Sequence, residues 1–248
     1  MKQMALCCVV VSMLLMLASC SFYDALSSYL PVASTSADTL GALPETIAST
    51  QQTEAATTEA IEPIPTEAPE DEAFVRIEQY VEGIVIDLKY ATTDNFTGQI
   101  IYNSGEAWLR YGTVNKLVLV EQELAEYGYR LKLWDGFRPP SAQFKLWKIC
   151  PDPTYVSDPN NGFSNHSRGN TVDVTLVDSS GKELVMPTGF DDFSALADRD
   201  YSDCSAEAAR NAMLLEEIME KYGFKGYRGE WWHYTDTDSY EVEQVFVP

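Results

Sequence analysis

The chain contains two histidines, His166 and His233, and each lies in a motif that suits a catalytic zinc site. His166 is followed seven positions later by Asp173, and His233 comes three positions after Glu230. Neutral imidazole and carboxylate are ordinary zinc ligands, and two histidines with one carboxylate leave a coordination position free for water. These residues therefore predict a zinc hydrolase.

The first motif also has an ordinary structural interpretation. His166 alone is typical of a surface loop, and Asp173 alone is typical of a turn or a strand edge. Asp173, however, is flanked by Val172 and Val174 in an apolar stretch, where an ionised carboxylate requires a cation or strong donors. We expect a hairpin-like reversal over residues 167–170 to bring both side chains to one metal.

The second motif separates a ligand from a base. We expect His233 to be the third ligand and Glu230 to accept a proton from the zinc-activated water and pass it to the departing amine. For this motif alone, the alternative is a structural strand in which Trp231 and Trp232 pack inward and Glu230 faces water. The combination of both motifs favours the catalytic interpretation.

Arg138 is a candidate for stabilising charge during the reaction. It precedes Pro139, which favours an extended conformation at the end of a predicted strand. A fixed guanidinium there suits an oxyanion that forms when an amide carbonyl is attacked. An ion pair with Asp135 is an equally open interpretation of the fragment.

The first 72 residues are not expected to join a packed core. Residues 1–20 combine Lys2, an apolar run and a small-residue ending before Cys20, which is typical of a secretory signal. This ending resembles a bacterial lipobox, so we expect Cys20 to carry lipid and the protein to be anchored on the outer face of the cytoplasmic membrane. A plain signal peptide cleaved near Ser19 is the alternative.

Residues 21–72 predict a disordered tether, because they are rich in Ser, Thr, Pro and Glu and contain no Lys or Arg. The formal net charge of the whole chain is −21, which argues against a nucleic-acid partner. In the remaining domain, residues 73–248, Cys150 and Cys204 are the only cysteines. An even count in an exported domain favours a disulfide between them, with two free thiols as the alternative.

The folded part mixes helices and strands without a regular alternation. We therefore expect an α+β fold in which helices flank an antiparallel sheet. Apolar spacing and end signals predict helices over 113–127, 140–148 and 205–222 and strands over 84–90, 129–134, 171–177, 183–185 and 226–234.

Four motifs together resemble a known family. Ser-x-His-x-x-Gly-x-x-x-Asp followed by Glu-x-x-His is similar to the zinc peptidase superfamily of D-alanyl-D-alanine dipeptidases, D-alanyl-D-alanine carboxypeptidases and the hedgehog zinc domain. Residues 87–98, 134–139, 164–176 and 230–234 resemble the dipeptidases of the vancomycin-resistance (VanX) type in particular. The resemblance runs from about residue 74 to the end of the chain and implies the same fold.

This resemblance implies a role for each matching residue. The zinc ligands would be His166, Asp173 and His233, with Glu230 as general base and Arg138 stabilising the transition state. Ser164 would contact the substrate, Asp191 would hold its ammonium, and Tyr90 would line the pocket. Asp192 adjoins Asp191, so the loop allows a shift by one residue.

The expected activity is zinc-dependent hydrolysis of the small dipeptide D-alanyl-D-alanine, with one Zn²⁺ per chain. A carboxypeptidase that trims terminal D-alanine from cell-wall stem peptides is the first alternative, since such peptides lie outside the cell. A zinc-containing binding module without turnover is the second, although it would be free to lose Glu230 and Arg138, which are both present.

Overall fold

The computed structural model describes residues 67–248. The predicted signal peptide at 1–20, the lipidation site Cys20 and the tether as far as residue 66 lie outside the described residues. These features and the domain boundaries remain predictions. Within residues 67–248, no helix is long and apolar enough to cross a membrane.

A five-stranded sheet with the order β2-β4-β5-β7-β6 forms the centre of the described part. Its strands are β2 (Val85–Ile86), β4 (Tyr129–Asp135), β5 (Thr171–Asp178), β6 (Phe224–Tyr227) and β7 (Glu230–Asp236). Neighbouring strands are antiparallel except β2, which runs parallel to β4. A separate antiparallel pair consists of β1 (Phe74–Arg76) and β3 (Trp108–Arg110).

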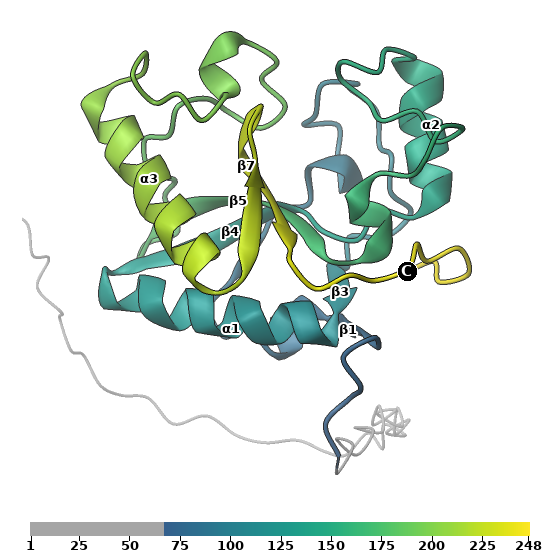
Figure 1. The fold of residues 1–248 in the computed structure, drawn as a ribbon, viewed down its shortest axis with the longest axis horizontal. Helices are drawn as coiled ribbons and strands as arrows, with labels where there is room; N and C mark the ends of the chain where they lie inside the picture. The colour runs from purple at the N-terminus through teal and green to yellow at the C-terminus, as the bar shows by residue number, and fades with distance from the viewer. Residues whose placement is uncertain (1–66) are drawn as a thin grey trace, which may run out of the picture. The chain divides into compact units, whose positions relative to one another are not determined.

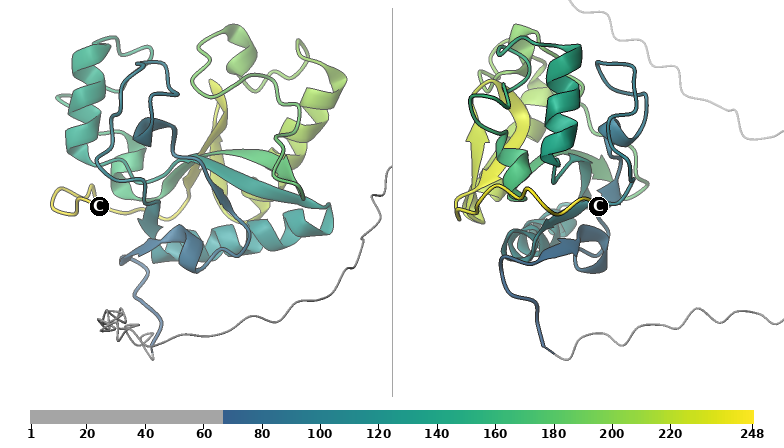
Figure 2. Two further views of the ribbon diagram at one scale, coloured as in Figure 1. Left: turned by 180° about the vertical axis from the view of Figure 1, so that it is seen from behind. Right: turned by 90° about the vertical axis from the view of Figure 1, so that its right-hand side faces the viewer.

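Three α-helices surround this sheet in the described residues: α1 (Tyr111–Glu126), α2 (Pro140–Ile149) and α3 (Ala206–Lys221). Helix α1 packs against β4, α3 packs against β6, and α1 and α3 contact each other. Helices α2 and α3 stand on opposite sides of β7 in both the front and the rear view (Figures 1 and 2). Four short 3-10 helices lie in the connections: η1 (Ile77–Gln79), η2 (Lys89–Ala91), η3 (Asn165–Arg168) and η4 (Ala195–Ala197).

The two faces of the sheet differ in character because side chains alternate along a strand. Leu131 and Leu133 of β4 lie opposite Leu176 and Val174 of β5, and all four are completely buried. Asp173, one residue before Val174, therefore points to the other face. The apolar face fixes the register of β5, and that register determines where Asp173 lies.

The predicted α+β class, with helices flanking a sheet, is confirmed, and so are the three helices, within two residues at each end. The predicted strand over 84–90 is wrong beyond Ile86, because Lys89–Ala91 form η2. The strand predicted over 226–234 is two strands, because the chain reverses between Tyr227 and Glu230. The sheet is also mixed rather than purely antiparallel, since β2 joins one edge in parallel.

The predicted disulfide is wrong, because Cys150 and Cys204 are both free thiols in the structure. Cys150 ends α2, whereas Cys204 lies just before α3, and these helices are on opposite sides of β7 (Figure 1). The Cys204 thiol instead donates to the carbonyl of Tyr201 at 3.4 Å. An even cysteine count gives no information on whether two helix ends meet.

Candidate metal centre and active site

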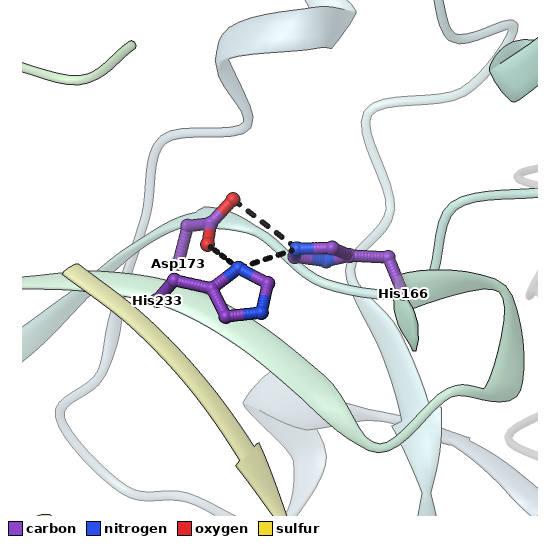
Figure 3. A group of neighbouring side chains, drawn as sticks. All are labelled: His166, Asp173 and His233. Atoms are coloured by element: carbon purple, nitrogen blue, oxygen red, sulfur yellow. Dashed lines mark hydrogen bonds and ion pairs between the residues drawn. The ribbon is translucent and has the colours of Figure 1, made fainter. Parts of the chain in front are cut away.

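The side chains of His166, Asp173 and His233 converge on one point, and their ligand atoms all lie within 4.8 Å of one another. His166 Nε2 is 3.3 Å from Asp173 Oδ2 and 3.4 Å from His233 Nδ1. His233 Nδ1 is 3.0 Å from Asp173 Oδ1. Figure 3 shows the three groups pointing toward one another. Two imidazole nitrogens and a carboxylate facing a common point form a donor set that suits a divalent metal such as zinc.

His166 is positioned by the 3-10 helix η3. Ser164 caps this helix, with its hydroxyl accepting from the His166 amide at 3.4 Å. Gly169 ends it at φ 77°, a conformation that glycine adopts without steric cost. The expected hairpin-like reversal is therefore a single helical turn. This turn lets the chain enter β5 so that His166 and Asp173 face each other.

A hydrogen bond fixes which nitrogen of His166 faces the metal point. Its Nδ1 lies 2.9 Å from the carbonyl oxygen of Gly136, so Nδ1 carries the proton and donates. Nε2 is then the nitrogen that faces Asp173 and His233 and would bind a metal. Backbone carbonyls commonly hold metal-binding histidines in this way.

Asp173 and His233 are brought together by strand pairing. They lie directly opposite each other on the antiparallel strands β5 and β7, and opposed residues share one face of a sheet. Burial alone would raise the pKa of Asp173, but the facing imidazoles of His166 and His233 outweigh it and hold that pKa well below its usual range. The carboxylate is thus kept ionised.

Glu230 lies beside the three ligands without joining them. Its Oε2 is 3.5 Å from His233 Nδ1, and it is not a member of the group whose donor atoms converge. Burial raises the pKa of Glu230, although His233 opposes the shift. A carboxylate with a raised pKa next to a metal site is suited to accept a proton near neutral pH.

Arg138 forms the ion pair with Asp135 that the sequence allowed, and it also lies where it could stabilise charge in the cavity. Its Nη2 donates to Asp135 Oδ2 at 2.6 Å and its Nη1 donates to Gln143 Oε1 at 3.0 Å. The guanidinium carbon also lies 5.1 Å from the centre of the Tyr90 ring, and Arg138 lines the cavity that contains the metal ligands. The ion pair therefore orients a cation toward the site. Asp135 is fully buried and accepts further hydrogen bonds from Tyr102 and the Gly136 amide.

Asp191 and Tyr90 line the same cavity as the metal ligands. The Tyr90 hydroxyl donates to Asp191 Oδ2 at 2.7 Å. Burial raises the pKa of Asp191 to about 7, even though Tyr90 opposes the shift. Asp191 is the non-glycine residue with a positive φ, 52°, in the described part. Asp192 instead accepts from the Ser194 amide within its own loop, so Asp191 is the residue that lines the cavity.

The cavity has a volume of about 250 Å³ and includes every catalytic, metal and substrate residue proposed from the sequence. It also includes residues that sequence reasoning missed: Pro153, Thr154, Tyr155, Ser157, Asn165 and Tyr227. Most of them lie between α2 and η3, a stretch without periodicity. Only Tyr227 gave a usable signal, since it is an aromatic residue in a glycine-flanked turn three positions before Glu230.

The comparison with known proteins agrees with this geometry. A family model described as D-ala-D-ala dipeptidase matches residues 70–247. The chain belongs to this family. It is similar to the D-alanyl-D-alanine dipeptidase of Escherichia coli (strain K12), with 40% identity over 149 residues that cover 60% of this chain and 77% of the relative.

Two enterococcal relatives are matched over more of their length. The D-alanyl-D-alanine dipeptidase of Enterococcus faecium is 34% identical over 66% of this chain and 92% of its own length. The D-alanyl-D-alanine dipeptidase of Enterococcus faecalis is 36% identical over 66% of this chain and 91% of its own length. The family resemblance drawn from the four motifs is thereby confirmed.

Proposed function

We propose that this protein is a zinc-dependent dipeptidase that hydrolyses D-alanyl-D-alanine to two D-alanines. One observation carries the proposal: a set of side chains suited to bind a metal, the partly buried carboxylate of Glu230 and the oriented guanidinium of Arg138 share one cavity. Membership of the D-Ala-D-Ala dipeptidase family supports the choice of substrate.

His166, Asp173 and His233 would hold the zinc. When bound, zinc supplies a Lewis acid that makes water a nucleophile near neutral pH. The donor set fits this role because Gly136 fixes the His166 tautomer and the imidazoles keep Asp173 ionised. The carboxylate of Glu230 accepts a proton from the attacking water as the new carbon–oxygen bond forms.

The remaining steps follow from the positions of Glu230 and Arg138. Attack on the peptide carbonyl places negative charge on its oxygen, and the guanidinium of Arg138, aligned by Asp135 and Gln143, stabilises that charge. Glu230 then transfers its proton to the departing nitrogen as the carbon–nitrogen bond breaks. One water is consumed, and a free carboxylate and a free amine are released.

The Asp191 end of the cavity supports a substrate with a free amino terminus. Asp191 is a partly buried carboxyl for which the described residues provide a hydroxyl partner, Tyr90, and no ion pair. A substrate ammonium would supply the missing positive charge. Ser164 lies near His166 on the cavity wall and is available to contact the other end of the substrate.

The size of the cavity supports a dipeptide over a stem peptide. Its volume of about 250 Å³ is below the roughly 300–1,000 Å³ of sites for drug-sized ligands. Tyr155, on the loop after α2, packs against Phe193 of the 189–198 loop with ring centres 4.6 Å apart. This contact links the loop after α2 to the segment that carries Asp191.

Alanine release tests the proposal. The purified full chain, loaded with zinc, is incubated with D-alanyl-D-alanine, L-alanyl-L-alanine and a wall pentapeptide ending in D-alanyl-D-alanine. We expect release from the D,D-dipeptide alone. Faster release from the pentapeptide would indicate a carboxypeptidase, and zinc binding without release from any substrate would indicate a binding module.

We also propose that the chain is exported and anchored to the membrane through lipid on Cys20. The lipobox-like ending at residues 17–20 supports this location. The substitution Cys20→Ala should move the protein from the membrane fraction to the soluble fraction. A protein that is soluble with Cys20 intact would contradict the anchor.

A further inference from the structure

Strand β7 carries both Glu230 and His233, yet few residues in its first half pair with the neighbouring strands. On one side, the pairing of β5 with β7 stops at Asp173 and His233. On the other side, Gly226 pairs with Tyr234, and the register then shifts so that Tyr227 pairs with Glu230. Within the described sheet, Trp231 and Trp232 therefore have no register partner on either strand.

The guanidinium of Arg199 bonds to the strands on both sides of this gap. Its Nε donates to the carbonyl oxygen of Tyr227 on β6 at 2.9 Å. Its Nη2 donates to the carbonyl oxygens of Trp231 at 3.1 Å and His233 at 3.0 Å on β7. One rigid side chain thus replaces several missing bonds of the ladder, and two of its acceptors lie within the Glu230–His233 segment.

The guanidinium of Arg199 is itself held in place by side chains of α3 and β7. Its Nη1 lies 3.3 Å from Glu216 Oε2 on α3 and donates to the Tyr234 hydroxyl at 3.2 Å. The guanidinium carbon lies 4.4 Å from the centre of the Tyr234 ring. A buried cation with an anionic partner and several carbonyl acceptors holds one orientation, which a lysine could not reproduce because its ammonium is a point charge.

Gly226 leaves the space that this arrangement needs. A Cβ atom at Gly226 would overlap the guanidinium of Arg199. An alanine there would push Arg199 away without removing its charge. Gly226 and Arg199 therefore act as a pair, and either can be changed to disturb the contact.

We propose that Arg199 is a positioning residue that aligns Glu230 and His233 for metal binding and proton transfer by bridging the gap between β6 and β7. The proposal rests on the proposed zinc hydrolase function and adds a determinant of its geometry. Arg199 acts through the backbone carbonyl oxygens of β7, and it does not line the cavity itself.

The test uses the zinc-loaded full chain and the variants Arg199→Lys, Arg199→Met and Gly226→Ala. Three quantities are measured: zinc affinity by competition with a chromophoric chelator, the visible spectrum of the Co²⁺-substituted protein, and kcat and KM for D-alanyl-D-alanine. Groups that orient metal ligands are worth about 10–100-fold in affinity or activity. We expect losses of that size in zinc affinity and kcat, a changed Co²⁺ spectrum, and a KM within about threefold of the original.

Lys116→Met is the matched control. Lys116 is a partly buried cation that pairs with Asp236 at the far end of the same strand, so its loss weakens β7 without touching the gap. We expect this variant to lower the melting temperature while keeping zinc affinity and the Co²⁺ spectrum. If Arg199→Met fails to fold, Arg199→Lys and Gly226→Ala provide the same comparison.

Two results would overturn the proposal. One is unchanged zinc affinity and kcat in folded Arg199→Lys and Gly226→Ala. The other is an equal loss of zinc affinity and kcat in Lys116→Met, which would mean that Arg199 contributes only to the general stability of the fold. Zinc affinity and the Co²⁺ spectrum require no substrate, so they test Arg199 even if the unaltered protein does not hydrolyse the dipeptide, a result that would contradict the proposed function separately.

Discussion

Asp173 and Asp191 are carboxylic acids that line one cavity, and their surroundings shift their pKa values in opposite directions. Burial raises the pKa of both. At Asp173 the facing imidazoles reverse this effect and hold the pKa well below its usual range. At Asp191 burial keeps the pKa raised, at about 7, because the hydrogen bond from Tyr90 offsets it only in part and the negative charge of Asp173 adds to it.

This difference gives the two acids separate roles. We call the part of the cavity around Asp173 the metal end and the part around Asp191 the ammonium end. Asp173 is ionised by groups of the protein itself and is prepared for a permanent cation. Asp191 forms no ion pair within the described residues, so a cation that arrives with the substrate would further stabilise its ionised form. Under the proposed function, the metal end binds zinc and the ammonium end binds the amino group of the substrate.

The largest expected effect comes from breaking the metal end. Chelation should abolish dipeptide hydrolysis and added zinc should restore it, because zinc lowers the pKa of bound water from 15.7 to about 7. Zinc at 100 times its Kd should also raise the free energy of unfolding by about 2.7 kcal/mol. Thermal unfolding with and without zinc checks this, and Asp173→Ala should lose the gain while Asp191→Asn keeps it. A zinc gain that survives in Asp173→Ala would contradict the assigned ligand.

Glu230→Gln should lower kcat by about 10²–10⁴-fold, because the amide cannot accept the proton of the attacking water. Zinc content, measured by atomic absorption, should be unchanged, since Glu230 lies beside the ligand set. Glu183→Gln, at an exposed glutamate that pairs with Lys132, is the control and should retain activity. Loss of zinc in Glu230→Gln would move Glu230 into the ligand set.

Arg138→Lys should lower kcat by roughly 10²-fold, because an ammonium cannot bond to Asp135 and Gln143 together and still present a fixed cation to the carbonyl oxygen. Steady-state kinetics check the loss. The exposed Arg130, on the same strand as Asp135, provides the control Arg130→Lys, which should behave as the unaltered protein. Equal kinetic constants for Arg138→Lys and Arg130→Lys would contradict a role of Arg138 in the reaction and would leave it only a structural role in the ion pair with Asp135.

The smallest effect is expected at the ammonium end. Asp191→Asn should raise KM about 10–100-fold with little change in kcat, since a hydrogen bond to a charged group contributes about 1.5–3 kcal/mol. In the unaltered protein, KM should rise as the pH falls through the pKa of Asp191, because the neutral acid no longer pairs with the ammonium. Burial raises this pKa to about 7, and the charge of bound zinc should place the midpoint in the zinc-loaded protein below that value. Asp191→Asn should lose the pH dependence, whereas Asp192→Asn should retain it.

The metal end could be predicted from the sequence because its determinants are local. The ligand His166 and the cap Ser164 lie in one short segment, and the apolar neighbours of Asp173 fix its strand. The sequence indicated Asp173 and His233 as ligands through their separate motifs, whereas their pairing across β5 and β7 became apparent only in the structure. The same local reasoning placed α1, since its buried residues repeat with helical spacing.

Features that depend on distant contacts could not be predicted. The gap at Trp231 is visible only when β5, β6 and β7 are aligned, and no motif indicated that Arg199 would enter it. Tyr155 reaches the cavity through its contact with Phe193, which lies far away in the sequence. The disulfide prediction failed for the same reason, because spacing does not report the separation of α2 and α3.

A comparison of a free with a blocked amino terminus tests the division between the two ends most directly. The values of kcat/KM for D-alanyl-D-alanine and N-acetyl-D-alanyl-D-alanine are measured in the unaltered protein and in Asp191→Asn. The account predicts a large preference for the free amine that disappears in Asp191→Asn. Equal rates on both substrates in the unaltered protein, or a preference that survives the substitution, would contradict it.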